Sequence, residues 1–339
     1  MAGAAKKWLF WDPFIAFLMA TVVLATLVPV RGTAAAMVAG VANVGIALLF
    51  FLHGARLSRE AIIDGAGNWR LHALVLASTY ILFPALGLAS AFALKGWIEP
   101  ALLPGILFLT LLPSTVQSSI AFTSIARGNV AAAVCSASLS NLFGIVVTPL
   151  LVTLLLHIDG SNAGSSWPAI RTIGLQLLVP FALGHALRPL IGGFVARHKA
   201  ILQPVDRGSI LLVVYSAFSA AVIGGIWSQV GAADLLILLV TSAVILTVML
   251  GATRILAQRL PLPRADATVL LFCGSKKSLV SGVPMAATLF APSQVGLIVL
   301  PLMIFHQLQL LVCAVLAARL QRQGDALESF DQRHNITGA

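Results

Sequence analysis

Two adjacent lysines interrupt an apolar stretch, in the sequence Gly274-Ser275-Lys276-Lys277-Ser278. An ammonium near the middle of a bilayer costs about 2.5–3.5 kcal/mol on insertion scales, and no carboxylate lies nearby in the sequence to neutralise either one. Desolvation could make a lysine neutral, carbonyls freed by a helix break could hold its ammonium, or it could face a cavity that takes an anion. A long side chain could also reach back to the interface.

A second group of polar side chains follows Pro113 in another apolar stretch. A helix that restarts within a membrane directs bare N–H groups and the positive end of its dipole into the bundle, where they favour a carboxylate, sulfate or phosphate. Single serines in membrane helices often bond only to their own backbone, so the cluster carries the interpretation. The candidate substrate- or ion-binding residues are Pro113, Ser114, Thr115, Gln117, Ser118, Ser119, Asn141, Ser275, Lys276, Lys277, Ser278 and His306.

His306 is the one member of this set whose side chain has an ordinary pKa near neutrality, although a lone buried histidine is more often a packing residue. Carboxylates are absent from mid-depth, and Asp266, near the start of an apolar run, comes nearest. A carrier that relies on a buried acid would need one there. The sequence contains no zinc-ligand spacing, nucleotide loop or hydrolase motif, so neither an enzyme nor a metal or cofactor site is expected.

The composition explains where these residues must lie. The chain has 339 residues, 59% of them apolar and 9% charged, with a mean hydropathy of +0.99. Soluble proteins are about one-quarter charged, so a soluble enzyme, a nucleic-acid binder and a disordered regulator are excluded. The expected class is an all-α integral membrane protein.

Apolar runs separated by Gly, Pro, Asn and charged residues predict ten membrane-spanning helices, because backbone polar groups must be satisfied within each span in lipid. The predicted spans are 13–30, 34–54, 71–94, 101–126, 130–156, 169–190, 208–227, 233–256, 266–290 and 295–318.

The basic residues test this segmentation. With the N-terminus in the cytoplasm, sixteen of the 21 Lys and Arg lie inside, and Arg31, Lys95 and Arg171 lie outside. Such asymmetry is what the positive-inside rule demands. We therefore expect a multi-pass protein of the cell (inner or plasma) membrane with both termini cytoplasmic, and the net charge of +10 requires no nucleic-acid partner.

Interruptions fall in the fourth span of each half of the chain. Paired interruptions of this kind point to a substrate site between inverted repeats. The predicted organisation is a first five-helix repeat at 1–156, a second at 157–320 and a short cytoplasmic tail at 321–339.

Several motifs together resemble the bile acid:sodium symporter superfamily, nearest to the branch of the seventh member of human solute carrier family 10 and its bacterial relatives. They cover nearly the whole chain in order, and their combination is specific. The motifs are Trp11-Asp12-Pro13-Phe14, Phe50-Phe51-Leu52-His53-Gly54, Leu112-Pro113-Ser114-Thr115-Val116-Gln117-Ser118-Ser119, Ala126-Arg127-Gly128-Asn129 with Thr148-Pro149, Phe272-Cys273-Gly274-Ser275-Lys276-Lys277-Ser278-Leu279, and Gly282-Val283-Pro284-Met285.

The resemblance implies a panel and a core domain, with the broken fourth and ninth spans crossing in the core and a substrate cavity between the domains. It also implies uptake of amphipathic or small organic anions with sodium. Sodium-coupled members carry an acidic residue and a glutamine in the break of the ninth span, where the matching stretch of this chain is Gly274-Ser275-Lys276-Lys277. Since lysine cannot ligate a cation, sodium coupling is in doubt here.

The leading hypothesis is a secondary transporter of small organic anions that works by alternating access, with sodium or protons left open as the coupling ion. One alternative keeps sodium, held by backbone carbonyls and hydroxyls such as those of Ser118 and Ser119. Another is a membrane regulator that moves no solute. The expected partners are the anion and the lipid bilayer. The sequence alone specifies neither the identity of the anion nor the oligomeric state.

Overall fold

The computed structural model describes residues 13–56, 68–156, 174–260 and 262–337, and this part of the chain is helical, with no strand. The prediction of an all-α protein is confirmed. In chain order the elements are α2 (Pro13–Leu27), α3 (Gly32–Arg56), α5 (Trp69–Ala77), η2 (Ser78–Leu82), α6 (Phe83–Ala93), η3 (Pro100–Leu102), α7 (Leu103–Leu111), α8 (Gln117–Ile125), α9 (Val130–Leu155), η4 (Gly174–Leu178), α11 (Val179–Arg197), α12 (Lys199–Ile223), α13 (Ile226–Gln229), α14 (Ala232–Arg259), α15 (Arg264–Gly274), α16 (Leu279–Leu289) and α17 (Pro292–Thr337).

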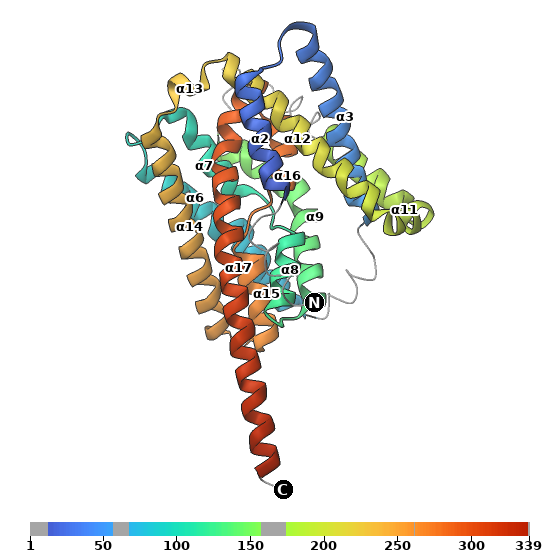
Figure 1. The fold of residues 1–339 in the computed structure, drawn as a ribbon, viewed down its shortest axis with the longest axis vertical. Coiled ribbons are helices and arrows are strands. Elements are labelled where there is room, and N and C mark those ends of the chain that lie inside the picture. Colours follow the sequence, from blue (N-terminus) through green and yellow to red (C-terminus); the bar gives the residue numbers. More distant parts are fainter. Residues whose placement is uncertain (1–12, 57–67, 157–173, 261, 338–339) are drawn as a thin grey trace.

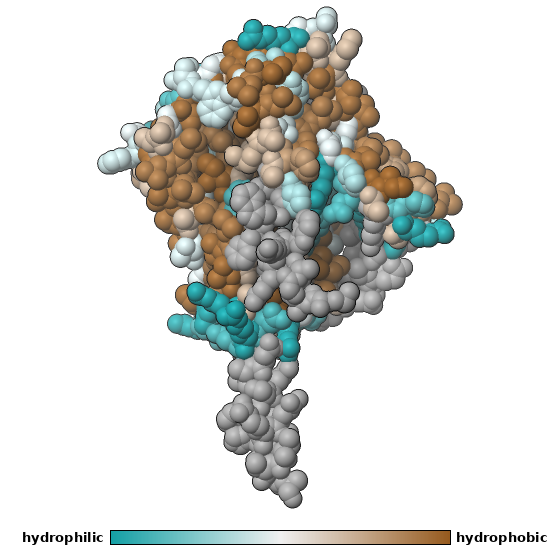
Figure 2. All heavy atoms as spheres, viewed as in Figure 1, coloured by the Kyte–Doolittle hydropathy of each residue, from teal (hydrophilic) through white to brown (hydrophobic). Residues whose placement is uncertain are grey.

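Seven helices in the described ranges are long and apolar enough to cross a membrane. Many of their large apolar side chains are exposed, among them Val44, Leu150, Leu190 and Leu236. Figure 2 shows broad apolar surface over the middle of the face in view, with hydrophilic residues gathered below it. Such a surface suits hydrocarbon and not water. The seven are Gly32–Arg56, Trp69–Ala93, Val130–Leu155, Leu175–Arg197, Ala200–Ile223, Ala232–Arg259 and Pro292–Gln323.

The three other predicted spans are short or divided. Helix α2 has 15 residues, α7 and α8 have nine each, and α15 and α16 have eleven each. A crossing helix needs about 20 residues, so the number of ten crossings stays a prediction.

Two predicted span boundaries differ most from the ends of the helices. Helix α12 begins at Lys199 and not at residue 208, and α17 continues from Pro292 to Thr337 and does not end at residue 318. A span predicted from apolar residues ends at the first polar residues. The helix itself can continue through polar residues where it leaves the apolar layer. As far as residue 337, the predicted tail is therefore a continuation of α17.

The described helices form two blocks. The unbroken-helix block contains α2, α3, α11 and α12, with α3 packed on α11 and α12; the broken-helix block contains α5 to α9 and α14 to α17. Helix α12 joins the blocks through α16 and α17. In Figure 1 the lower end of α3 and all of α11 lie well above the lower ends of α14 and α15.

Two glycines set the distance between α3 and α11. A Cβ on Gly54 would lie 2.0 Å from the carbonyl oxygen of Phe181, and one on Gly184 would lie 1.9 Å from that of Phe51. Glycines that face each other in this way let helix backbones touch in a membrane. Alanine at either position would push the two helices apart.

Asp266 links the starts of three helices in the broken-helix block through hydrogen bonds. Its two carboxylate oxygens accept hydrogen bonds from the amides of Asn68 (2.7 Å) and Asn129 (2.9 Å). The side-chain oxygen Oδ1 of Asn129 in turn caps α9 by accepting the N–H of Ala132 at 3.0 Å. The motif around Asn129 thus serves to position α5, α9 and α15.

Candidate functional site: a cavity at two helix breaks

The two breaks have local causes. Pro113 disfavours helical dihedrals in the residue before it, and Leu112 accordingly is extended, with ψ at 158°. On the other side, α15 ends at Gly274 and α16 restarts after Ser278, whose hydroxyl caps the new helix by accepting the N–H of Ser281 at 3.2 Å. Each break therefore follows from its own sequence.

The breaks lie against each other. The N–H of Ser278 donates to the carbonyl of Pro113 at 2.9 Å, and the Ser114 hydroxyl donates to the carbonyl of Cys273 at 2.6 Å. Ser119 adds a bond from its hydroxyl to the carbonyl of Phe272 at 3.0 Å. Backbone groups freed by one break are thus satisfied by the other, as burial requires.

Helices α9 and α17 hold the crossing from both sides. Asn141 on α9 donates to the carbonyl of Ser114 at 2.8 Å and accepts the hydroxyl of Ser281 at 2.8 Å. Gln309 on α17 accepts the N–H of Lys277 at 2.9 Å and donates to its carbonyl at 2.8 Å. The amide of Gln309 also contacts Nδ1 of His306 at 2.7 Å.

The Lys277 ammonium is held by backbone carbonyls. Its side chain is fully buried, and Nζ donates to the carbonyl of Leu112 at 2.6 Å and to that of Thr79 at 2.9 Å. The Leu112 carbonyl is free because α7 ends there. The Thr79 carbonyl is free because the π-helical turn η2 pairs each carbonyl with the fifth residue on, which for Thr79 is Pro84, and proline has no N–H. The ammonium also lies 4.2 Å from the ring centre of Phe83.

The Lys276 ammonium meets aromatic faces and a hydroxyl. It lies 4.4 Å from the ring centre of Phe122 and 5.6 Å from that of Phe272, and Nζ donates to the Ser118 hydroxyl at 3.3 Å. This side chain is fully buried too. Both Ser118 and Phe122 line a cavity, so Lys276 lies one layer behind its wall.

That cavity, of about 960 Å³, separates the two blocks. The starts of α8 and α16 both open onto it, through Thr115 to Ser118 and Ser278 to Ser281. Two helix N-termini present N–H groups and positive partial charge to the same space. The broken-helix block adds hydroxyl, amide and imidazole groups from Ser138, Asn141, His306 and Gln307.

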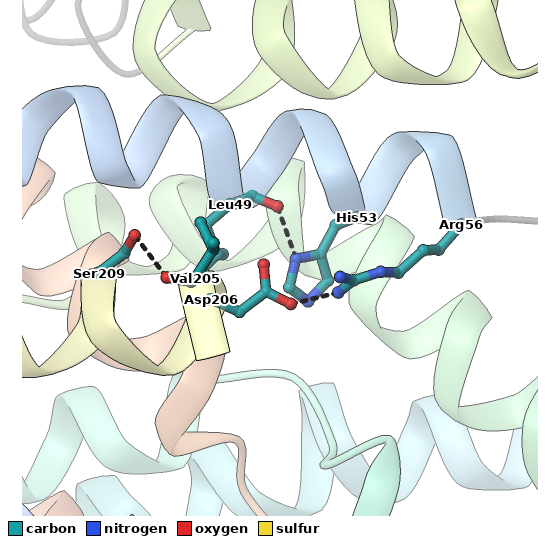
Figure 3. Close-up of polar contacts among 6 residues, drawn as sticks. All are labelled: Leu49, His53, Arg56, Val205, Asp206 and Ser209. Atoms are coloured by element: carbon teal, nitrogen blue, oxygen red, sulfur yellow. Dashed lines mark hydrogen bonds and ion pairs between the residues drawn. The ribbon is translucent and has the colours of Figure 1, made fainter. Parts of the chain in front are cut away.

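The opposite wall, from α3 and α12, carries the charged side chains. Arg56 donates from Nη1 to Oδ2 of Asp206, and His53 bonds through Nδ1 to the carbonyl of Leu49 at 2.8 Å. Figure 3 shows the imidazole beside this ion pair. The guanidinium of Arg207 lies 5.3 Å from the ring centre of Phe14.

The structure divides the twelve sequence candidates into two sets. Those that line the cavity are Thr115, Gln117, Ser118, Asn141, Ser278 and His306, and those that lie behind it are Pro113, Ser114, Ser119, Ser275, Lys276 and Lys277. The charged wall was missed. Starting one predicted span at residue 208 left Asp206 and Arg207 outside it, and ending another at residue 54 left Arg56 outside and His53 at its edge. Their spacing of three on one helix face was the available signal.

Helices that break inside an apolar bundle and open onto a shared cavity define a class of membrane protein, the secondary transporters. The chain belongs to the SBF-like CPA transporter family, whose sequence model matches residues 12–322. The resemblance drawn from the motifs is thereby confirmed, as is the prediction of a membrane transporter rather than an enzyme.

Three relatives are similar to this chain in sequence over most of its length. A putative symporter, YfeH, of Escherichia coli K12 is 52% identical over 318 residues, which are 94% of this chain and 95% of that protein. An uncharacterized protein of Pseudomonas aeruginosa, PA2026, is 58% identical over 314 residues, 93% and 94% of the two chains. Sodium/bile acid cotransporter 7 of the mouse is 29% identical over 290 residues, 83% of each. The chain is thus a multi-pass transporter of the bile acid:sodium symporter type, with a small solute as substrate.

Proposed function

We propose that the chain is a secondary transporter of organic anions that uses alternating access and does not couple transport to sodium. The observation that carries the proposal is the cavity onto which the starts of α8 and α16 both open. Two positive helix ends, with hydroxyls and amides around them, suit an anionic group. The apolar side chains between the walls, such as Leu279 and Ile210, suit a hydrophobic body attached to it.

The geometry around Lys277 supports independence from sodium. Backbone carbonyls at a helix break are sodium ligands in many transporters, but here the carbonyls of Thr79 and Leu112 already hold an ammonium.

The proposed architecture has ten crossings, with repeats at 1–156 and 157–320 and a panel and a core domain that correspond to the unbroken-helix and broken-helix blocks. Alternating access would move the core against the panel. The cavity-lining residues Arg56 and Gln203 lie at the ends of α3 and α12 that the distribution of basic residues places in the cytoplasm, which fits a cavity that opens toward that side. Both termini would lie on that side of the plasma or inner membrane.

Uptake into proteoliposomes tests the substrate class and the coupling together. Radiolabelled cholate, an amphipathic carboxylate chosen because the mouse relative is named as a bile acid cotransporter, should enter at equal rates with sodium or choline outside. Faster uptake with sodium would refute sodium independence. Failure of cholate and of short carboxylates to enter under either condition would refute the anion proposal.

A sodium-coupled symporter is the second candidate, because relatives such as the mouse protein are named as sodium cotransporters. The thermal unfolding midpoint of the purified protein discriminates between the two. An ion that binds only the folded state raises the midpoint saturably, so a saturable rise in sodium against choline at constant ionic strength would favour this candidate.

Cysteine labelling tests the orientation. The natural cysteines Cys135, Cys273 and Cys313 are buried and unpaired, so an impermeant maleimide should give a low background. We expect an Arg31→Cys variant to react in intact cells and an Arg259→Cys variant to react only after the membrane is opened. The reverse pattern would invert the proposed topology.

A further inference from the structure

The two walls of the cavity differ in charge. The wall from the broken-helix block presents neutral groups, such as Gln117 and Asn141, together with His306. The formally charged side chains that line the cavity in the described part of the chain are Arg56, Asp206 and Arg207, on α3 and α12. Arginine side chains bind carboxylates through charge-assisted hydrogen bonds, so a carboxylate bound in the cavity would find its cationic partner at this wall.

The ion pair between Arg56 and Asp206 is unequally buried. The Arg56 side chain is 31% exposed and that of Asp206 is 10% exposed, so the guanidinium reaches into the cavity while the carboxylate lies in the wall. Contact runs from Nη1 to Oδ2 alone. The other carboxylate oxygen, Oδ1, is buried and has no hydrogen-bond partner.

An ion pair with this geometry contributes little to the packing of α3 on α12. A buried carboxylate costs several kcal/mol of desolvation, which is repaid only when its lone pairs are satisfied, and an arginine and a carboxylate pair best through two parallel bonds. Arginine has five N–H donors and can hold two oxyanions at once. The geometry is that of a guanidinium that a second carboxylate could share or take over.

We propose that Arg56 forms an oxyanion-binding subsite in the wall of the unbroken-helix block, and that Asp206 competes with the bound oxyanion for this arginine. In the empty cavity Asp206 occupies Arg56. A substrate carboxylate displaces it, and Asp206 reclaims the arginine when the substrate leaves. The inference rests on the proposed function, in that it makes this cavity the substrate site and assigns the anionic end of the substrate to the wall opposite the helix breaks.

Competition makes a prediction that a structural role does not. Removal of the competing charge should tighten the binding of an anion, whereas removal of the arginine should weaken it. If the pair served only to join α3 to α12, both changes would lower stability and neither would improve binding.

Binding of cholate and of its uncharged amide, measured with the full chain in lipid nanodiscs, tests this. We expect Asp206→Asn to lower the Kd for cholate and Arg56→Gln to raise it, each by about tenfold, as one charge-assisted hydrogen bond implies. The amide should bind equally to both variants. Arg254→Gln, an exposed α14 residue outside the cavity, makes the same charge change as Arg56→Gln and should leave cholate binding unaltered. The subsite is refuted if the wild type binds cholate and Asp206→Asn binds it no more tightly.

A chemical modification experiment tests the Arg56 subsite without depending on which substrate the protein carries. Phenylglyoxal modifies guanidinium groups, and mass spectrometry locates the product. We expect Arg56 to react several-fold faster in Asp206→Asn than in the wild type, and benzoate to protect it. An unchanged rate, or no protection, overturns the subsite even if cholate is transported; protection without cholate binding keeps the subsite and rejects only cholate-like substrates.

Discussion

Lys276 and Lys277 are neighbours in the sequence and are both fully buried, but their ammonium groups meet opposite surroundings. Lys277 donates to the carbonyls of Thr79 and Leu112, at the crossing of the breaks. Lys276 lies over the rings of Phe122 and Phe272 and touches one hydroxyl, behind the cavity wall. Carbonyls left without a donor in an apolar interior are costly, whereas aromatic rings are satisfied without a cation. We infer that Lys277 holds the site together and that Lys276 supplies charge to it.

The largest effect should come from Lys277→Met, which keeps the length of the side chain and removes its charge. Two buried carbonyls would lose their donor, at a cost of about 2–5 kcal/mol in the free energy of unfolding. We expect Tm to fall by about 5–10 °C and uptake to be lost. A Tm and an uptake rate like those of the wild type would show that the carbonyls need no cation.

Lys276→Met is the matched change at the neighbouring position. Phe122 and Phe272 can pack against methionine, so Tm should stay close to that of the wild type. The loss of one charge behind Ser118 should lower kcat/KM for an anion by about tenfold. If this variant instead lost as much stability as Lys277→Met, the two lysines would have the same role and the comparison would fail.

A vacancy test sharpens the comparison further. Lys277→Ala would leave the carbonyls of Thr79 and Leu112 facing an empty space, which a monovalent cation could enter. We expect sodium to stabilise this variant by about 1 kcal/mol in a saturable way, and to have no such effect on Lys276→Ala, whose space is lined by rings. A sodium response from Lys276→Ala alone would reverse the assignment.

The smallest predicted effect concerns one ring. Phe122→Leu removes the nearer aromatic face from Lys276, at a cost of about 0.5–1 kcal/mol for a cation–π contact. Uptake of anions should change less than threefold, and denaturant-dependent unfolding should register the loss. Phe83→Leu, which removes the corresponding ring from Lys277, should cost no more, because the carbonyls would still hold that ammonium.

The helical class and both breaks could be predicted from the sequence because they depend on local rules. Pro113 restricts its predecessor, and Gly274 with the polar run after it ends a helix wherever they occur. The candidate residues that surround the crossing, from Ser114 to Ser278, followed from the same reasoning.

Long-range contacts could not be predicted in this way. Which lysine would meet which carbonyls depends on how Gln309, from α17, fixes the chain at Lys277. The free carbonyl of Thr79 depends on a π-helical turn, whose pattern has no simple sequence signal. The charged wall was hidden by a helix boundary placed nine residues late, since a search for apolar residues cannot find the polar turns of α12.

The close approach of α3 and α11 at Gly54 and Gly184 bears on the order in which the protein can assemble. Helix α3 is synthesised early, but the backbone against which Gly54 packs belongs to α11, in the second half of the chain. During translation the surface of α3 around Gly54 therefore lacks its packing partner until α11 has entered the membrane. A ribosome that stalls between the two helices would leave behind a chain with its unbroken-helix block unassembled, the kind of intermediate that quality control recognises.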